Sequence, residues 1–276
     1  MTPLPERLVL LGHPLGHSLS PIFQNAALRA AGIPLVYELL DVPRSVLDDT
    51  LAGLRRKRAA GNVTIPHKEA VRAACDRLSD TANAVGAVNT FWVAVDGALV
   101  GDNTDVGGFQ AAAAELLGDG GSAPDGLVVA LLGAGGAAAA VLHALERWPR
   151  ARVRLYSRTP SRAEELVQRF RVQTEVARSA EDAVDDAGLV VNATPVGLRD
   201  DTVPVRIDAL PRDSAVLDLA YRAPPRETAL VRDARARGLR AMDGLKMLVE
   251  QGALSFERWF GVTPDRKAMW DALKSS

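Results

Sequence analysis

The fold of this chain is decided by the stretch Leu127-Val128-Val129-Ala130-Leu131-Leu132-Gly133-Ala134-Gly135-Gly136-Ala137-Ala138. Its apolar half predicts a buried strand, and the glycine-rich turn leads into an alanine-rich helix. Gly133, Gly135 and Ala138 fill the three small positions of a dinucleotide-binding turn, which needs a tight bend, close backbone approach and close helix packing. Such glycines also close loops that bind nothing, but the flanking strand and helix favour a nucleotide. We therefore predict that a dinucleotide binds to the backbone of Gly133, Ala134, Gly135, Gly136 and Ala137.

The end of the next strand indicates which dinucleotide is bound. NAD sites usually carry an acidic residue there, which holds the ribose hydroxyls. Here the sequence reads Tyr156-Ser157-Arg158-Thr159-Pro160-Ser161-Arg162 and contains no carboxylate. The alternative is that Thr159 caps the helix starting at Pro160 while the arginines only face water, but capping and phosphate binding are compatible. Because guanidinium groups bind phosphate in a planar fork, we predict NADP, with Ser157, Arg158, Thr159 and Arg162 at its 2′-phosphate.

Composition narrows the class of protein. The chain has 276 residues, 47% of them hydrophobic, and its 33 basic and 34 acidic side chains give a net charge of −1. That balance predicts neither a nucleic-acid partner nor a membrane partner. The single cysteine, Cys75, excludes an intramolecular disulfide and a cysteine-based metal cluster. No signal-like or membrane-spanning apolar run occurs, so we expect a cytoplasmic protein that binds a small molecule, with no metal.

Short apolar runs alternate with helical segments along the chain, which predicts an α/β protein with largely parallel sheets. Two domains across a cleft fit this length better than one. Near residue 117 the composition changes to a glycine-rich loop, and a regular β-α-β series begins after it. Expected strands are 7–12, 35–39, 62–65, 85–95, 98–101, 127–132, 153–156, 189–193, 215–219 and 239–242. Expected helices are 20–32, 45–54, 106–117, 135–147, 160–170, 226–237, 245–260 and 265–273, the first of them capped by Ser20.

Polar residues in the first half of the chain occur where packing alone would not favour them. They lie in Gly16-His17-Ser18-Leu19-Ser20, Asn62-Val63-Thr64-Ile65-Pro66-His67-Lys68, Gly86-Ala87-Val88-Asn89-Thr90 and Asn103-Thr104-Asp105. Each of these segments lies within or after a predicted strand. Because α/β proteins bind ligands at strand ends that border a crevice, we expect a ligand site here.

Together with Gly133-Ala134-Gly135-Gly136-Ala137, Asn192-Ala193-Thr194-Pro195-Val196-Gly197 and Gln251-Gly252-Ala253-Leu254, these segments resemble the shikimate dehydrogenase family over nearly the whole chain. The resemblance implies a reversible, NADPH-dependent reduction of 3-dehydroshikimate to shikimate in aromatic amino-acid biosynthesis. It also implies a substrate domain of residues 1–104 completed by the helices of 243–276, and a Rossmann-type NADP-binding domain of residues 105–242. A monomer and a homodimer both remain open.

The resemblance also implies roles for individual residues. Lys68 and Asp105 would be the catalytic pair. Ser18 and Ser20 would bind the substrate carboxylate, which Tyr221 would also touch. The ring hydroxyls would be read by Asn62, Thr64, Asn89, Asp105 and Gln251. Asn192, Ala193 and Thr194 would lie along the cofactor, with Gly244 and Met247 near the nicotinamide.

Elementary chemistry agrees with the catalytic assignment. Hydride delivery to a carbonyl carbon builds negative charge on the oxygen, and a lysine ammonium both stabilises and protonates it. Without the motif, Lys68 would be read as a solvent-facing helix residue and Asp105 as a helix cap. The family often has Asn where this chain has Ser157, and Lys where it has Leu19, so one adenosine contact and the steering of the substrate are left open.

Other functions are weighed against this one. A quinate/shikimate dehydrogenase with broader substrate or NAD use differs too little in substrate to be excluded. A non-enzymatic NADP sensor would keep the Gly133 turn but would have no reason to keep Lys68 with Asp105. A serine hydrolase is rejected, because the segment at Ser18 lacks the second glycine of a nucleophile elbow and no histidine follows in a suitable place.

Overall fold

The computed structural model of the chain describes residues 4–16, 18–118 and 124–275. The chain forms two compact units, one made of Met1–Asp105 with Val249–Ser276 and the other of Val106–Leu248. The second junction lies inside helix α10 (Leu245–Phe260), C-terminal to the expected 242/243 boundary. The first turn of α10 is tied to the second unit, since Lys246 pairs with Glu115 at 2.8 Å. The boundary expected from the sequence lies just before the helix, because the sequence does not reveal the contact between Lys246 and Glu115.

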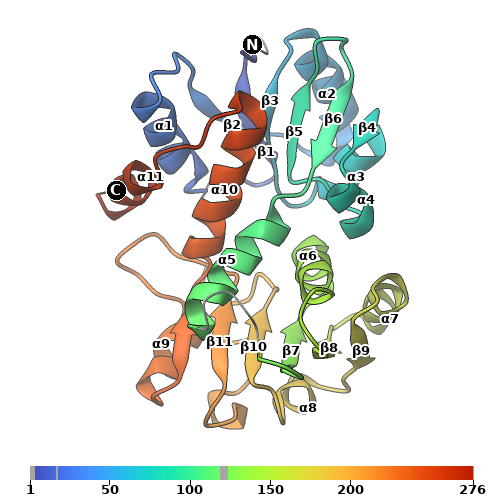
Figure 1. Cartoon of the computed structure of the whole chain (residues 1–276), viewed down its shortest axis with the longest axis vertical. Coiled ribbons are helices and arrows are strands. Elements are labelled where there is room, and N and C mark those ends of the chain that lie inside the picture. The colour runs from blue at the N-terminus through green and yellow to red at the C-terminus, as the bar shows by residue number, and fades with distance from the viewer. Residues whose placement is uncertain (1–3, 17, 119–123, 276) are drawn as a thin grey trace. The chain divides into compact units, whose positions relative to one another are not determined.

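The first unit is built on a six-stranded sheet with the order β2-β1-β3-β5-β6-β4 (Figure 1). Its strands are β1 (Leu8–Gly12), β2 (Tyr37–Asp41), β3 (Ala60–Val63), β4 (Arg77–Leu78), β5 (Thr90–Val93) and β6 (Leu99–Asp102). The first three run parallel, whereas β5 is antiparallel to both β3 and β6. The central strands β1 and β3 are buried along their whole length, as expected for a sheet covered on both faces.

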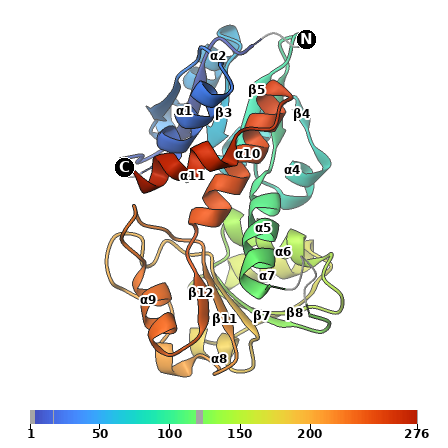
Figure 2. The same ribbon diagram turned by 60° about the vertical axis from the view of Figure 1, so that its left-hand side comes forward.

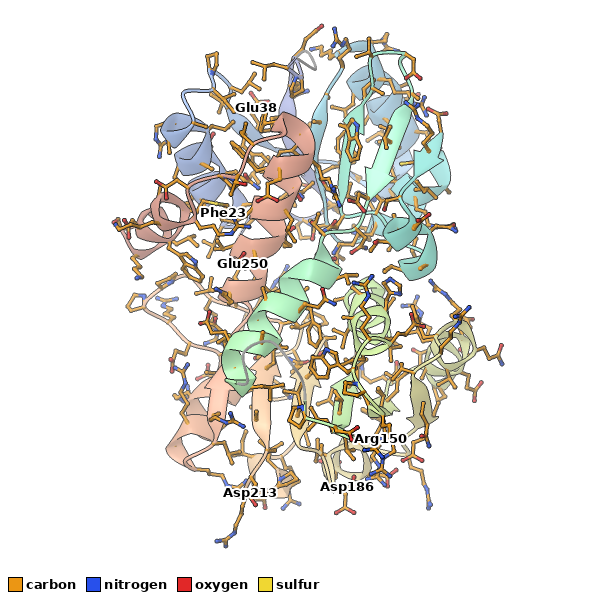
Figure 3. The ribbon with its side chains drawn as sticks, viewed as in Figure 1. Phe23, Glu38, Arg150, Asp186, Asp213 and Glu250 are labelled. Atoms are coloured by element: carbon orange, nitrogen blue, oxygen red, sulfur yellow. The ribbon has the colours of Figure 1, made fainter. Side chains whose placement is uncertain are left out.

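Helices cover both faces of this sheet. Apolar side chains of α2 (Leu47–Arg56), α3 (Lys68–Ala74) and α4 (Asp80–Val85) share one core with β1 and β3. Helix α11 (Arg266–Lys274) packs against α1 (Ser20–Ala30), as Figure 2 shows. Phe23 of α1, labelled in Figure 3, lies where Gly252 of α10 has no side chain. A Cβ at Gly252 would stand 2.4 Å from the Phe23 ring, so this close helix packing requires glycine.

The second unit carries an entirely parallel six-stranded sheet with the order β12-β11-β10-β7-β8-β9. Read in the opposite direction this is the 3-2-1-4-5-6 order of the doubly wound dinucleotide-binding fold, so the predicted Rossmann-type architecture is confirmed. The strands are β7 (Val128–Leu132), β8 (Arg152–Tyr156), β9 (Gln173–Val176), β10 (Leu189–Asn192), β11 (Ala215–Asp218) and β12 (Arg240–Met242). The chain reverses direction across the sheet between β7 and β10, which is where such folds bind ligands.

Helices of the second unit are α5 (Asp105–Leu117), α6 (Gly136–Leu145), α7 (Pro160–Arg169), α8 (Ala180–Val184) and α9 (Ala229–Ala236). Short 3₁₀ turns occur at Arg44–Val46 in the first unit and at Ile207–Ala209 in the second. Apolar residues of α8 and α9 form one core with β10, β11 and β12. No helix among the described residues is long and apolar enough to cross a membrane.

Several local predictions differ from the structure. The expected strand 85–95 is only Thr90–Val93, because α4 extends to Val85, with Ser79 capping its start and Gly86 its end at φ +69°, and residues 86–89 connect the helix to the strand. Ser20 is not a cap, since α1 begins at Ser20 itself after Leu19. Strands β4 and β9 and helices α4 and α8 were not predicted, because their apolar patterns are only a few residues long. The antiparallel strands β5 and β6 are joined by a tight turn at Asp96-Gly97, with Gly97 at φ +84°.

Candidate functional site

Lys68 and Asp105 form a close, largely buried ion pair. Lys68 opens α3 directly after the β3 exit, and Asp105 opens α5 after β6. The Lys68 Nζ lies 2.5 Å from Asp105 Oδ2, and the two side chains are 18% and 7% exposed. Lys68 is therefore not the solvent-facing helix residue that its position alone would suggest. The pair places a proton donor and a carboxylate together on the rim of the first unit's sheet.

Neighbouring side chains fix both members of this pair. The fully buried His67 donates from Nε2 to the Val42 carbonyl oxygen at 2.6 Å, which holds the residue before Lys68. Asn103 Oδ1 accepts the Asp105 backbone N–H at 3.1 Å. Asp105 Oδ1 accepts from Asn89 Nδ2 at 2.8 Å. The pair is thus pre-organised rather than formed between two free side chains.

Asn89 lies at the centre of a buried amide network. Its Nδ2 donates to Gln251 Oε1 at 3.2 Å and to Thr104 Oγ1 at 2.9 Å, besides Asp105. Its Oδ1 accepts the Thr104 backbone N–H at 2.7 Å. The predicted site residues Asn89, Asp105 and Gln251 are therefore brought together, although they come from three distant parts of the chain. Thr104 joins them and was not singled out from the sequence.

Asn62 belongs to the same network but its amide has protein partners on both sides. Its Nδ2 donates to Ser255 Oγ at 2.8 Å and to the Asn89 carbonyl oxygen at 3.1 Å, and its Oδ1 accepts from the Tyr37 hydroxyl at 2.8 Å. Tyr37 and Ser255 were not predicted, because a tyrosine at a strand start and a serine within a helix carry no local signal. Asn62 thus joins β3 to β2 and α10.

The hydroxyls of Ser18, Ser20 and Thr64 make fewer hydrogen bonds to the protein than the amides of Asn62 and Asn89 do. The Ser18 hydroxyl accepts the Ser20 backbone N–H at 3.3 Å. Within the described part of the chain, the Ser20 and Thr64 hydroxyls make no hydrogen bond. The loop that carries Ser18 is held in place by Asp41, which accepts the Leu15 backbone N–H at 3.0 Å. Free hydroxyl donors beside a fixed loop are suited to an anionic or hydroxylated ligand.

The glycine turn of the second unit has the geometry predicted for each small position. Gly133 has φ +114°, and a Cβ there would lie 2.9 Å from the Ala193 carbonyl oxygen. Gly135 is extended and precedes α6, and a Cβ on it would meet nothing within 4 Å. Ala138 is fully buried. Open space at Gly135 beside the free N–H groups of Gly136 and Ala137 fits a pyrophosphate.

The basic segment after β8 lies beside this turn, because Tyr156 pairs with Leu132 in the sheet. Arg158, Thr159 and Arg162 are exposed and Ser157 is partly buried. Thr159 has the N-cap position of α7, but its hydroxyl makes no cap bond. No carboxylate of the described residues pairs with Arg158 or Arg162. Two unpaired guanidinium groups therefore remain available for an anion.

The remaining predicted site residues of this unit, Gly244, Met247 and Tyr221, differ in their packing and burial. Gly244 donates its N–H to the Ala220 carbonyl oxygen at 3.0 Å, and a Cβ on it would stand 2.2 Å from the Leu219 carbonyl oxygen. Close backbone approach therefore explains this glycine without a cofactor. Met247 is 8% exposed. Tyr221 follows β11, and burial raises its pKa to about 12, which keeps the phenol protonated at neutral pH.

Asp218, at the end of β11, was not predicted and has an unusual titration. Burial raises its pKa to about 6, with the nearby Asp243 adding to the rise, while hydrogen bonds from Thr228, Asn192 and Ala220 oppose it. The proton is thus bound more tightly in the folded than in the unfolded chain. The carboxyl group therefore favours folding at low pH, and this advantage is lost as the pH rises through about 6.

This titration gives a testable prediction for the Asp218→Asn variant. Since asparagine does not titrate, the variant should gain stability relative to the parent chain as the pH rises from about 4 to about 8, by roughly 3 kcal/mol for a carboxyl pKa raised to about 6. Urea unfolding of both proteins across this pH range measures the difference. A difference that stays constant with pH would show that Asp218 titrates normally.

Comparison with known proteins places these features in one family. The family described as "Shikimate dehydrogenase substrate binding domain" matches residues 10–91, and "Shikimate 5'-dehydrogenase C-terminal domain" matches residues 244–274. A "Shikimate dehydrogenase (NADP(+))" of Rubrobacter xylanophilus is 45% identical over 271 residues, which cover 96% of this chain and 94% of that protein. The chain belongs to the shikimate dehydrogenase family.

Solved structures of shikimate dehydrogenases have the same fold. That of Aquifex aeolicus aligns with a TM-score of 0.89 at 34% identity, covering 99% of this chain and 100% of the other. A Thermus thermophilus enzyme in complex with NADP(H) and shikimate aligns with a TM-score of 0.84 at 40% identity, covering 98% of each chain. Residues 111–206, within the second unit, also match the ornithine cyclodeaminase/mu-crystallin family. The family expected from the sequence motifs is therefore confirmed.

Proposed function

We propose that this chain catalyses the NADP-dependent interconversion of 3-dehydroshikimate and shikimate. The observation that carries the proposal is the Lys68–Asp105 ion pair, 2.5 Å long and fixed by Asn89 and Asn103, in a chain of this family. An unreactive NADP-binding protein would have no need to hold an ammonium and a carboxylate in this way. The Thermus thermophilus relative supports the choice of ligands, since its structure contains NADP(H) and shikimate.

The reaction assigns a simple role to the ammonium group. NADPH, when bound, supplies the hydride for the ring carbonyl carbon. Lys68 then stabilises the negative charge on the carbonyl oxygen and donates the proton that makes it a hydroxyl. Asp105 holds Lys68 in place and accepts from a neighbouring ring hydroxyl. In the oxidative direction Lys68, having lost a proton to solvent, takes the hydroxyl proton back.

The substrate is proposed to bind to the first unit. Ser18 and Ser20 donate to its carboxylate, and the Tyr221 phenol of the second unit adds a donor. Thr64 and Gln251 bind ring hydroxyls. Because the Asn62 and Asn89 amides already bond to Tyr37, Thr104 and Ser255, we assign them a positioning role alongside any contact with the ring. An apolar analogue would leave the Ser20 and Thr64 hydroxyls unpaired and would be rejected.

The cofactor is proposed to bind to the second unit. The N–H groups of the Gly133–Ala137 turn hold the pyrophosphate, and Ser157, Arg158, Thr159 and Arg162 hold the 2′-phosphate. Asn192, Ala193 and Thr194 line the cofactor, and Gly244 and Met247 lie near the nicotinamide. In this proposal the first unit is the substrate domain and the second unit is the NADP domain.

A single assay tests the function and its alternatives. Purified chain is mixed with NADP⁺ or NAD⁺ and with shikimate or quinate, and the absorbance of the reduced cofactor is followed. The proposal expects the highest kcat/KM for shikimate with NADP⁺. Higher efficiency with quinate or NAD⁺ would instead identify the broader dehydrogenase. NADP⁺ binding without turnover on either substrate would identify a sensor and exclude the enzyme.

The carboxylate site gives a further prediction. Replacing Ser18 and Ser20 together by Ala removes two donors to an anion, each contributing about 1.5–3 kcal/mol. The KM for shikimate should therefore rise by more than about tenfold. The Kd for NADP⁺, measured by calorimetry, should not change. The exposed Ser45→Ala variant is the control in the same unit. Equal losses of affinity for both ligands would refute the assignment.

A further inference from the structure

The proposed reaction gives no role to Asp218, although its side chain is fully buried. Among the residues that the structure describes, no Lys, Arg or His side chain forms an ion pair with it. Burying a carboxylate without a cation is costly, and an apolar residue at the end of β11 would avoid the cost. The hydrogen-bond partners of Asp218 indicate what this carboxylate holds in place.

Three donors from three segments converge on this carboxylate. Asp218 Oδ1 accepts from Asn192 Nδ2 at 2.8 Å and from the Ala220 backbone N–H at 3.0 Å. Asp218 Oδ2 accepts from Thr228 Oγ1 at 2.7 Å. Asn192 ends β10, which lies beside β11 in the sheet (Figure 1), and Thr228 precedes α9. Asp218 thus ties together the segments that leave the carboxyl edge of β10 and β11.

The bond to Asn192 determines which way that amide points. A carboxylate only accepts hydrogen bonds, so the NH₂ group of Asn192 must face Asp218 and its Oδ1 must face away. The Oδ1 accepts the Thr194 backbone N–H at 3.0 Å and the Thr194 hydroxyl at 2.6 Å. The Nδ2 also donates to the Val196 carbonyl oxygen at 3.2 Å. One oriented amide therefore shapes the turn of residues 193–196.

This turn is the immediate neighbour of the dinucleotide turn. A Cβ on Gly133 would lie 2.9 Å from the Ala193 carbonyl oxygen and 3.0 Å from Thr194 Cγ2. Any displacement of the 193–196 turn would therefore alter the space beside Gly133. We propose that Asp218 is a positioning residue for the cofactor, which acts by orienting the Asn192 amide and so holding the 193–196 turn beside Gly133. The inference rests on the proposed binding of NADP.

Asparagine at this position would not serve equally well. Its amide can present either oxygen or nitrogen to Asn192, so both orientations of the Asn192 amide would compete. Bonds to an uncharged acceptor are also weaker than those to a carboxylate. Asp218→Asn should therefore retain part of the function, whereas Asp218→Ala, which accepts nothing, should lose most of it.

The test measures NADP⁺ and shikimate binding by calorimetry in the full chain. Asp218→Ala should raise the Kd for NADP⁺ by at least about tenfold, and Asp218→Asn by about threefold or more. The Kd for shikimate should stay within about twofold of the parent value in both. Asp213→Asn, an exposed aspartate near the start of β11 that Figure 3 labels, is the matched control and should change neither affinity.

A double-mutant cycle separates positioning from a direct effect on the fold. If Asp218 acts through Asn192, then Asn192→Ala should weaken NADP⁺ binding as Asp218→Ala does, and the double variant should be little worse than either. Additive effects would overturn the inference. So would unchanged NADP⁺ affinity in folded Asp218→Ala. If Asp218→Ala does not fold, unchanged affinity in Asp218→Asn overturns it. A parent chain that does not bind NADP⁺ would refute the proposed function as well.

Discussion

Replacing Lys68 by Ala should lower kcat by at least about 10²-fold while changing the KM for shikimate much less. The reason is that negative charge develops on the substrate oxygen mainly in the transition state, so the ammonium contributes little to binding the neutral carbonyl or hydroxyl. The ion pair with Asp105 shows that Lys68 is held in place by the protein itself. The variant therefore loses a pre-organised proton donor, not a flexible surface charge.

Two further variants make this test specific. Lys57→Ala removes an exposed lysine of the same unit and should leave kcat unchanged. Asp105→Asn keeps the size of the side chain but removes the charge that holds Lys68, so its kcat should also fall while the chain remains folded. Steady-state kinetics and thermal unfolding are measured for all three. A Lys68→Ala variant with more than about a tenth of the parent kcat would remove Lys68 from the mechanism.

The sequence predicted the second unit well because its signals are local. The strand, the glycine turn and the helix that opens at Gly136 follow one another directly, and the structure gives Gly133, Gly135 and Ala138 the conformation, the space and the burial expected of each. Short elements such as β9 and α8 were missed because four or five residues contain too little periodicity to distinguish a strand or helix from a loop.

The polar network of the first unit was predicted only in part, because its contacts are long-range. Asn89 and Gln251 were both singled out, but the hydrogen bond between them joins a strand entry to a helix of the C-terminal segment. Tyr37 and Ser255 complete the surroundings of Asn62, yet neither lies in a motif. Such long-range partners can be identified only when the order of the strands is known, because that order determines which segments are adjacent.

Sequence motifs also do not show which of their residues touch the cofactor. Asn192 was selected for its motif, but its side chain is wholly buried and bonds to Asp218 and to its own turn. Gly244 is required by the approach of the Leu219 carbonyl oxygen. A motif shared with a family therefore combines residues that touch the ligand with residues that shape the site, and only the folded structure distinguishes the two.

The largest change in specificity is expected from Arg158→Asp. The segment after β8 offers Arg158 and Arg162 without a neighbouring carboxylate among the described residues, directly beside the Gly133 turn. A 2′-phosphate carries nearly two negative charges, so Arg158 should bind it through bidentate, charge-assisted bonds, with Arg162 adding a weaker, more screened attraction. Aspartate replaces that attraction with repulsion, and kcat/KM for NADP⁺ should fall by at least about 10²-fold.

The same substitution should leave kcat/KM for NAD⁺ unchanged or raise it, because a carboxylate in this place can accept hydrogen bonds from the free ribose hydroxyls. The ratio of kcat/KM for NADP⁺ and NAD⁺ is measured with saturating shikimate. Arg152→Asp is the matched control, since Arg152 is an exposed arginine at the opposite end of the same strand and the charge change is identical. That control should keep the parent ratio, because a charge there lies a whole strand length away from the Gly133 turn. If Arg158→Asp also keeps it, or if the parent chain already prefers NAD⁺, then Arg158 does not face the 2′-phosphate and the assignment of NADP from this segment is wrong.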